Sequence, residues 1–175
     1  MESIVLGVMS MDKNKEAAIK AERMINGLGQ DGRAFINKWI GFAAFYEGFD
    51  GRDERLTLIN AVAGAFTNDE ANALLKVHQA EIEYLFDLPP GDLRYEGDES
   101  KFRHQTQQDI YRACNQKEDA CMRIGHLVAV IYQVRNNLVH GAKDPTTLRS
   151  QDLFLASDKI MSSVLGVLLE HANPA

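Results

Sequence analysis

Apolar residues recur at helical spacing along most of the chain, and no convincing run shows the period-two alternation typical of strands. Helices are predicted over 13–26, 33–47, 55–66, 67–88, 103–114, 117–139 and 151–171. Thr67 or Asn68 can cap the fourth of these, and Pro89 and Pro90 forbid its continuation. Residues 88–100 are predicted to form one clear loop and residues 141–150 a turn.

Three apolar stripes predict the core. The stripe of the second helix contains Trp39, Phe42, Tyr46 and Phe49. The stripe over 117–139, the strongest in the chain, contains Ile124, Leu127, Val128, Ile131, Val134 and Leu138. The last helix is expected to bury Leu153, Leu155, Ile160, Val164, Leu165, Val167 and Leu168. We therefore predict one all-α domain over 1–175, a helical bundle of five to seven helices with a long antiparallel C-terminal helix pair.

Composition narrows the class of protein. The chain has 175 residues, of which 45% are hydrophobic and 25% charged, and this argues against a disordered chain, a collagen or a coiled-coil rod. Cys114 and Cys121 match no zinc pattern and are expected to be reduced thiols. The start lacks the features of a secretory signal, and no apolar run approaches the roughly 20 residues that span a bilayer. We expect a cytoplasmic protein that needs no cofactor or metal and has no membrane partner.

Charge is unevenly distributed. The formal net charge is −6, so general coating of nucleic acid is not expected. Residues 101–149, however, hold 8 Lys and Arg against 4 Asp and Glu. Arg103, His104 and Arg112, with Lys117 and Arg123, could extend a basic track for RNA towards the end of the helix over 117–139, but solvated helix faces are the favoured explanation.

The most informative stretch is the end of the strongest helix, residues 131–141. Tyr132, Asn136 and His140 follow one another at intervals of four, so they lie close to one stripe, and Arg135 lies at its edge. Gly141 is a natural left-handed residue after a helix end. We expect the helix to stop at His140, which frees the imidazole to swing towards Arg135 and Asn136.

These side chains suit chemistry on a phosphodiester. Histidine takes and gives protons near neutral pH, and arginine offers a planar fork of donors to phosphate oxygens. Asn136 could orient the imidazole or bind phosphate, and Tyr132 could stack on a base. The set suits metal-independent attack of a ribose 2′-OH on its own phosphodiester. The same cluster can also be purely structural, because basic side chains are favoured at helix C-termini.

The pattern Arg135-Asn136-x-x-x-His140-Gly141, late in a long helix and followed by one last apolar helix, resembles the HEPN superfamily. The resemblance covers about residues 117–171. It implies a helical bundle that forms a homodimer through the helix carrying Arg135 and His140, with both pairs in one composite cleft. It also implies a metal-independent endoribonuclease, of the kind found in toxin–antitoxin, phage-defence and RNA-processing systems. On this carry-over Arg135 binds the scissile phosphate, Asn136 orients it and His140 transfers protons.

Other residues complete the prediction. Tyr132, Lys143 and Arg123 are candidate substrate-binding residues around the catalytic candidates. Ala142 stands where related toxins often carry a tyrosine that their antitoxins modify, so regulation of that kind is not expected. His126 is expected to be a packing histidine, and the carboxylates at Asp50, Asp53 and Glu54 lack the partners of a metal site. Two further functions remain open: a non-catalytic binding or assembly module, and a toxin component regulated by an antitoxin or other protein partner.

Overall fold

The protein is an all-α bundle. The computed structural model describes residues 27–47, 49, 51, 53–87, 89–92, 95, 97–139 and 144–172, and within these ranges it contains helices and no strands. The helices are α2 (Gln30–Tyr46), α3 (Glu54–Ala65), α4 (Asn68–Val77), α5 (Gln79–Asp87), α6 (Glu99–Phe102), α7 (His104–Cys114), α8 (Ala120–Val139) and α9 (Leu148–Ala172). The prediction of an all-α bundle is confirmed, and α6 is only a single turn beside the seven longer helices. The predicted helix over 13–26 lies outside the described residues.

Several helix boundaries differ from the prediction: α2 begins three residues earlier, α8 begins three residues later, and α6 begins inside the predicted loop over 88–100. The predicted fourth helix is divided into α4 and α5 at His78, whose ring shares a hydrogen bond of 2.7 Å with Ser163 of α9. The break thus falls where a tertiary contact is made, at a point where the local sequence carries no Gly or Pro. The last helix begins at Leu148, because the Thr147 hydroxyl accepts a hydrogen bond from the Ser150 N–H and caps it.

The predicted cap at Thr67 is present as a reciprocal pair. The Glu70 N–H donates to Thr67 Oγ1 at 3.4 Å, and the Thr67 N–H donates to Glu70 Oε2 at 2.8 Å. This capping box satisfies two backbone donors that a helix start leaves open. It fixes the beginning of α4.

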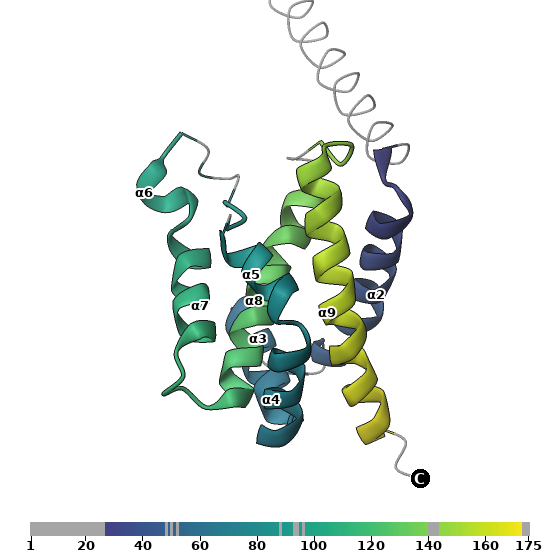
Figure 1. The fold of residues 1–175 in the computed structure, drawn as a ribbon, viewed down its shortest axis with the longest axis vertical. Coiled ribbons are helices and arrows are strands. Elements are labelled where there is room, and N and C mark those ends of the chain that lie inside the picture. Colours follow the sequence, from purple (N-terminus) through teal and green to yellow (C-terminus); the bar gives the residue numbers. More distant parts are fainter. Residues whose placement is uncertain are drawn as a thin grey trace, which may run out of the picture.

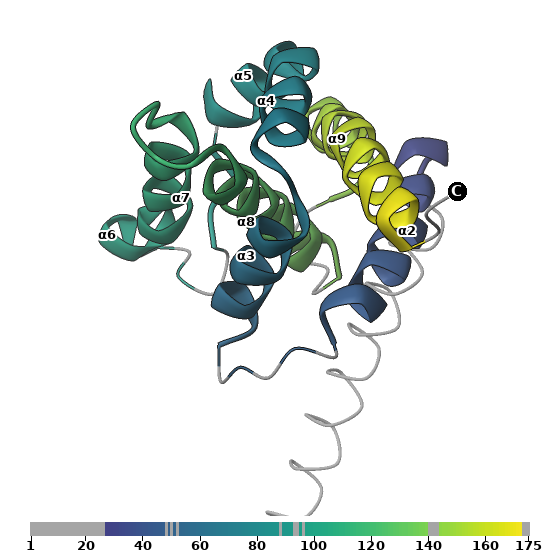
Figure 2. The same ribbon diagram turned by 90° about the horizontal axis from the view of Figure 1, so that it is seen from below.

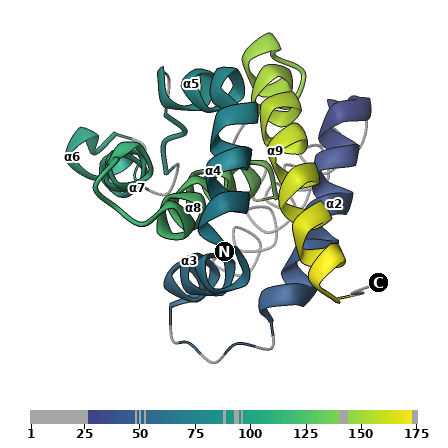
Figure 3. The ribbon, with the colours of Figure 1, turned by 60° about the horizontal axis from the view of Figure 1, so that its bottom comes forward.

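Helix α8 runs through the middle of the bundle. Helices α3 and α7 pack along it, whereas α9 packs chiefly against α2 and α5. Figures 2 and 3 show α2 beside α9 and α7 beside α8. Helices α8 and α9 run in opposite directions, as predicted (Figure 1). The partner that α9 contacts most is nevertheless α2, to which it is also joined by an ion pair of 2.5 Å between Lys38 and Asp158.

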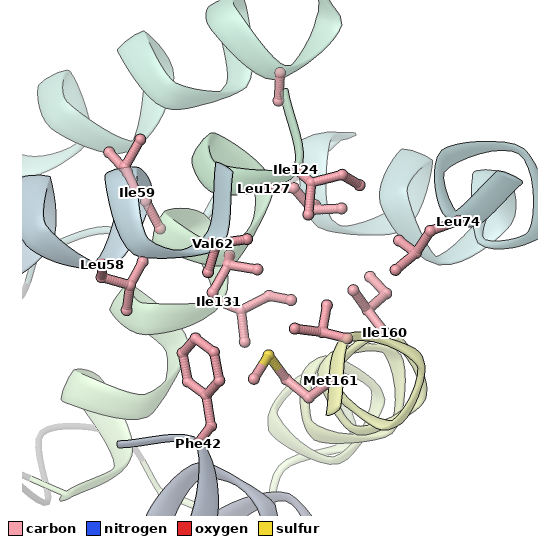
Figure 4. Packing of buried hydrophobic residues seen from close by; sticks show 14 of the residues in the cluster. Phe42, Leu58, Ile59, Val62, Leu74, Ile124, Leu127, Ile131, Ile160 and Met161 are labelled. Carbon is pink, nitrogen blue, oxygen red and sulfur yellow. The ribbon is translucent and has the colours of Figure 1, made fainter. Parts of the chain in front are cut away.

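The core forms where these helices meet. Figure 4 shows Phe42 of α2, Val62 of α3, Ile131 of α8 and Met161 of α9 converging on one cluster. All six apolar residues predicted on the α8 stripe are buried. Close approach of α3 and α8 requires Gly125, since a Cβ there would lie 2.6 Å from the carbonyl oxygen of Ile59.

Two residues predicted for the core are exposed. Phe49 is 49% exposed because α2 ends at Tyr46, so the helical stripe does not reach it, and its ring contacts Phe45 instead. Leu155 is 40% exposed because it lies beside the buried stripe of α9, which contains Phe154. In both cases the predicted helix is correct, and the apolar residue lies just outside the face that the helix buries.

Candidate functional site

The candidate site lies on one face of the last two turns of α8. Tyr132, Arg135 and Asn136 are three and four residues apart, so their side chains leave the helix on the same side. All three are partly buried, and Val139 on the same face is 43% exposed. The structure therefore brings together three of the predicted site residues.

The Arg135 guanidinium is held by its neighbour. Arg135 Nη1 donates to Asn136 Oδ1 at 2.9 Å. The Asn136 amide oxygen is thus engaged with the guanidinium, and this bond does not use the N–H donors of the same amide. This bond uses one of the five donors of Arg135 and restricts the orientation of its planar fork.

Glu54, which the sequence analysis did not select, connects this face to two other helices. Its carboxylate accepts a hydrogen bond of 2.7 Å from the Tyr132 hydroxyl and one of 3.0 Å from the Tyr46 hydroxyl. Glu54 is the first residue of α3, and Tyr46 is the last of α2. The carboxylate also lies at the positive end of the α3 dipole, where a negative charge is favoured.

Both phenols remain protonated donors at neutral pH. Burial raises the pKa of Tyr46, and the hydrogen bond to Glu54 raises it further. Burial also raises the pKa of Tyr132. The hydrogen bond with the Asn136 side chain and the positive charge of Arg135 lower this pKa and so offset part of the increase. Neither phenol can act as a general base near neutral pH.

Together these five residues, Tyr46, Glu54, Tyr132, Arg135 and Asn136, form what we call the Arg135 cluster. Its formal charge is zero, because Arg135 offsets Glu54. Tyr132 and Glu54 are 78 residues apart in sequence, so no local pattern relates them. Only the residue types indicate this contact: a tyrosine ends the aromatic stripe of α2, and a carboxylate begins the next helix.

Arg123, another predicted site residue, is not part of this cluster. Arg123 lies twelve residues before Arg135, about 18 Å away along the helix axis. Its Nε donates to the carbonyl oxygen of Ala113 at 2.8 Å, so it holds the end of α7. His140 and Lys143, with Gly141, lie outside the described residues.

A second polar group lies inside the bundle. Asp109 of α7 is only 2% exposed, forms an ion pair with Arg55 of α3, and accepts a hydrogen bond of 2.9 Å from His126 Nδ1 of α8. Burial lowers the pKa of Arg55 to about 10, which leaves it cationic at neutral pH. His126 is thus the packing histidine that the sequence predicted, and the group ties three helices together.

Within the described ranges, no three His, Cys, Asp or Glu side chains are grouped so that they could hold a metal ion. None of the helices described is both long and apolar enough to cross a membrane. Comparisons of the chain with protein-family models, with curated proteins and with solved structures found no match. The class that the coordinates define is an all-α bundle with a polar cluster near the end of its central helix.

Proposed function

We propose that this protein is a metal-independent endoribonuclease of the HEPN type that acts as a homodimer through the end of α8. The observation that carries the proposal is the Arg135 side chain, oriented by Asn136 at 2.9 Å on a partly exposed helix face. An oriented guanidinium retains donors that match phosphate oxygens, whereas a freely moving one must be ordered during binding. The assignment of His140 as the partner of Arg135 rests on the motif that links them in sequence.

The proposed reaction is an internal transesterification. One imidazole removes the proton from the 2′-OH, the 2′ oxygen attacks phosphorus, and the bond from phosphorus to the 5′ oxygen breaks. A second imidazole, from His140 of the partner subunit, gives a proton to the leaving 5′ oxygen. The products are a 2′,3′-cyclic phosphate and a 5′-hydroxyl, and Arg135 stabilises the charge that develops on the phosphate oxygens.

Glu54 sets the expected character of RNA binding. Its negative charge beside Arg135 leaves the cluster neutral, and the chain as a whole carries a formal charge of −6. Affinity for a polyanion therefore comes from few ionic contacts and should depend only weakly on salt. Such a site favours a flexible, single-stranded backbone that can reach in-line geometry over a rigid duplex.

The first test is cleavage of a fluorescent single-stranded RNA in excess EDTA. Wild-type protein should release products that end in a 2′,3′-cyclic phosphate, while His140→Ala and Arg135→Met should each lose at least about a hundredfold in rate. Arg33→Met is the matched control, because Arg33 is exposed on α2 and its substitution removes the same charge. An inert wild type, or equal cleavage by His140→Ala purified in the same way, would refute the nuclease proposal.

A second candidate function is a non-catalytic assembly module, and one observation favours it. Glu54 already bonds both Tyr132 and Tyr46, so the cluster joins α2, α3 and α8 without any substrate. On this view Arg135→Met lowers the melting temperature of the protein and weakens its self-association. The nuclease proposal expects the melting temperature of this variant to change little, and sedimentation velocity measures the association directly.

A further inference from the structure

A cavity of about 320 Å³ lies where α8 ends and α9 begins, at the upper end of the bundle in Figure 1. It is lined by residues 89–91, by the junction of α6 and α7, and by the neighbouring turns of α8 and α9. Its volume is within the range of small-molecule sites. Val134, Asn137 and Leu138 line it from α8. On an ideal helix their mean direction is opposite to that of Tyr132 and Asn136, and only Leu138, three residues from Arg135, approaches the direction of Arg135, so the cavity lies across α8 from most of the Arg135 cluster.

Two polar side chains of the cavity wall, Asn137 and Ser150, are already hydrogen-bonded within the protein. Asn137 Nδ2 donates to the carbonyl oxygen of Gly91 at 2.8 Å, and Asn137 Oδ1 accepts from Gln133 at 3.0 Å. The Ser150 hydroxyl donates to the carbonyl oxygen of Asp144 at 2.8 Å. The rest of the interior surface is largely apolar. A ligand bound in the interior therefore contacts apolar surface, so binding is favoured when the buried part of the ligand is apolar.

One wall of the cavity is held firmly in place. A Cβ at Gly91 would lie 2.2 Å from the ring of Phe102, so this ring rests directly on the Gly91 backbone. The Asp92 N–H also donates to the Phe102 carbonyl oxygen at 2.6 Å. Leu153 and Phe154 of α9 line the cavity as well. Flat and branched apolar surfaces are thus available before any ligand arrives.

The charged residues of the lining are mainly cationic. Arg103 and Arg149 line the cavity, and Asp144 is the one carboxylate among the described lining residues. The Arg149 guanidinium lies 5.1 Å from the ring centre of Tyr84, and that of Arg103 lies 5.6 Å from the ring centre of Phe102. Stacking on aromatic rings orients guanidinium groups. Among the described lining residues, the excess of one positive charge complements a monoanion, and Asp144 disfavours a more highly charged ligand.

We propose that this cavity binds a small amphipathic carboxylate, with a compact apolar body in the interior and its carboxylate at Arg103 and Arg149. Three features carry the proposal together: a volume suited to a small molecule, a largely apolar interior in which Asn137 and Ser150 are already hydrogen-bonded, and two arginines against one carboxylate among the described lining residues. The proposal is independent of the nuclease reaction, because it uses the other face of α8. It assigns the protein a ligand site that a nuclease mechanism does not require.

Isothermal titration calorimetry with 4-phenylbutyrate and its neutral amide tests both parts of the proposal. Wild-type protein should bind the acid saturably with one site per chain, about tenfold more tightly than the amide, as one charge-assisted contact implies. Arg103→Met and Arg149→Met should each remove most of this preference and leave the affinity for the amide nearly unchanged. Arg33→Met, which removes an equal charge from α2, should bind like the wild type.

A variant that fills the cavity separates specific from general binding. Leu153→Trp should abolish binding of both compounds while circular dichroism shows a folded helical protein. If that variant or Arg149→Met fails to fold, the exposed Arg103 still decides whether charge matters. The proposal is overturned if no saturable binding occurs at millimolar concentration or if acid and amide bind equally. It is also overturned if Arg33→Met loses as much affinity as Arg103→Met, or if a folded Leu153→Trp binds normally.

Discussion

The same substitution at two helical glycines should change stability in opposite directions. Gly125 lies in α8 where α3 crosses it, and a Cβ there would be 2.6 Å from the Ile59 carbonyl oxygen and 3.1 Å from Ile59 Cγ2. The nearest atom belongs to the backbone, so it cannot rotate away. Gly41, in the middle of α2, is exposed and has nothing within 4 Å of the position that a Cβ would occupy.

The magnitudes follow from these surroundings. Gly125→Ala forces α3 and α8 apart by several tenths of an ångström, and such overpacking costs about 1–3 kcal/mol. Replacing glycine by alanine within a helix returns about 0.5–1 kcal/mol. We therefore expect Gly125→Ala to lower the free energy of unfolding by up to about 2.5 kcal/mol. Gly41→Ala has the stabilising effect on the helix without the overpacking, so it should raise the free energy of unfolding by about 0.5–1 kcal/mol.

Urea unfolding at 25 °C measures both effects. Trp39 is the single tryptophan and is 2% exposed, so its fluorescence reports the loss of the core, and far-ultraviolet circular dichroism reports the helices. The slopes of the two transitions should match the wild type, so that the midpoints carry the difference. The reasoning about close packing fails if Gly125→Ala is as stable as Gly41→Ala, or if both variants shift the midpoint in the same direction.

Two further outcomes test the polar contacts. Asp109→Asn should destabilise the protein by about 3 kcal/mol in urea unfolding, because it leaves the buried Arg55 charge without its counterion and weakens the bond to His126; a loss below about 1 kcal/mol would contradict this. Hydrogen bonds from the N-cap backbone, the N-cap side chain and His171 hold the pKa of Glu70 at about 2, and the bond to Glu70 raises the pKa of His171. The stability that the Glu70 carboxylate contributes is thus present above its ordinary pKa and is lost as the pH falls towards 2. The stability that the His171 imidazolium contributes is present below its ordinary pKa and is lost as the pH rises through its raised pKa. In an NMR titration, Glu70→Gln should return the pKa of His171 towards 6.5, and an unchanged pKa would show that the bond does not form in solution.

The helices and the core of α8 could be predicted because their signal is local. A continuous apolar stripe leaves little choice about which face of α8 is buried, and the capping box at Thr67 requires only residues three apart. The same pattern carries no information on which helices become neighbours. The extensive contact between α2 and α9, and the hydrogen bond between His78 and Ser163 at the break between α4 and α5, join residues over long sequence separations.

The candidate site was predictable only along α8. The spacing of Tyr132, Arg135 and Asn136 places them on one face, and the structure bears this out. Glu54 could not be found in this way, because its partner Tyr132 is 78 residues distant. Asp109 shows the same limit, since a carboxylate in the polar helix α7 is expected in solvent, yet this one is 2% exposed.

The packing of α2 against α9 constrains how the chain can fold during synthesis. Lys38 and Asp158, which join these two helices, are separated by 120 residues. A ribosome therefore releases α2 with its large aromatic side chains long before the helix that covers them exists. The face of α2 that α9 covers should therefore stay exposed in the nascent chain until α9 emerges.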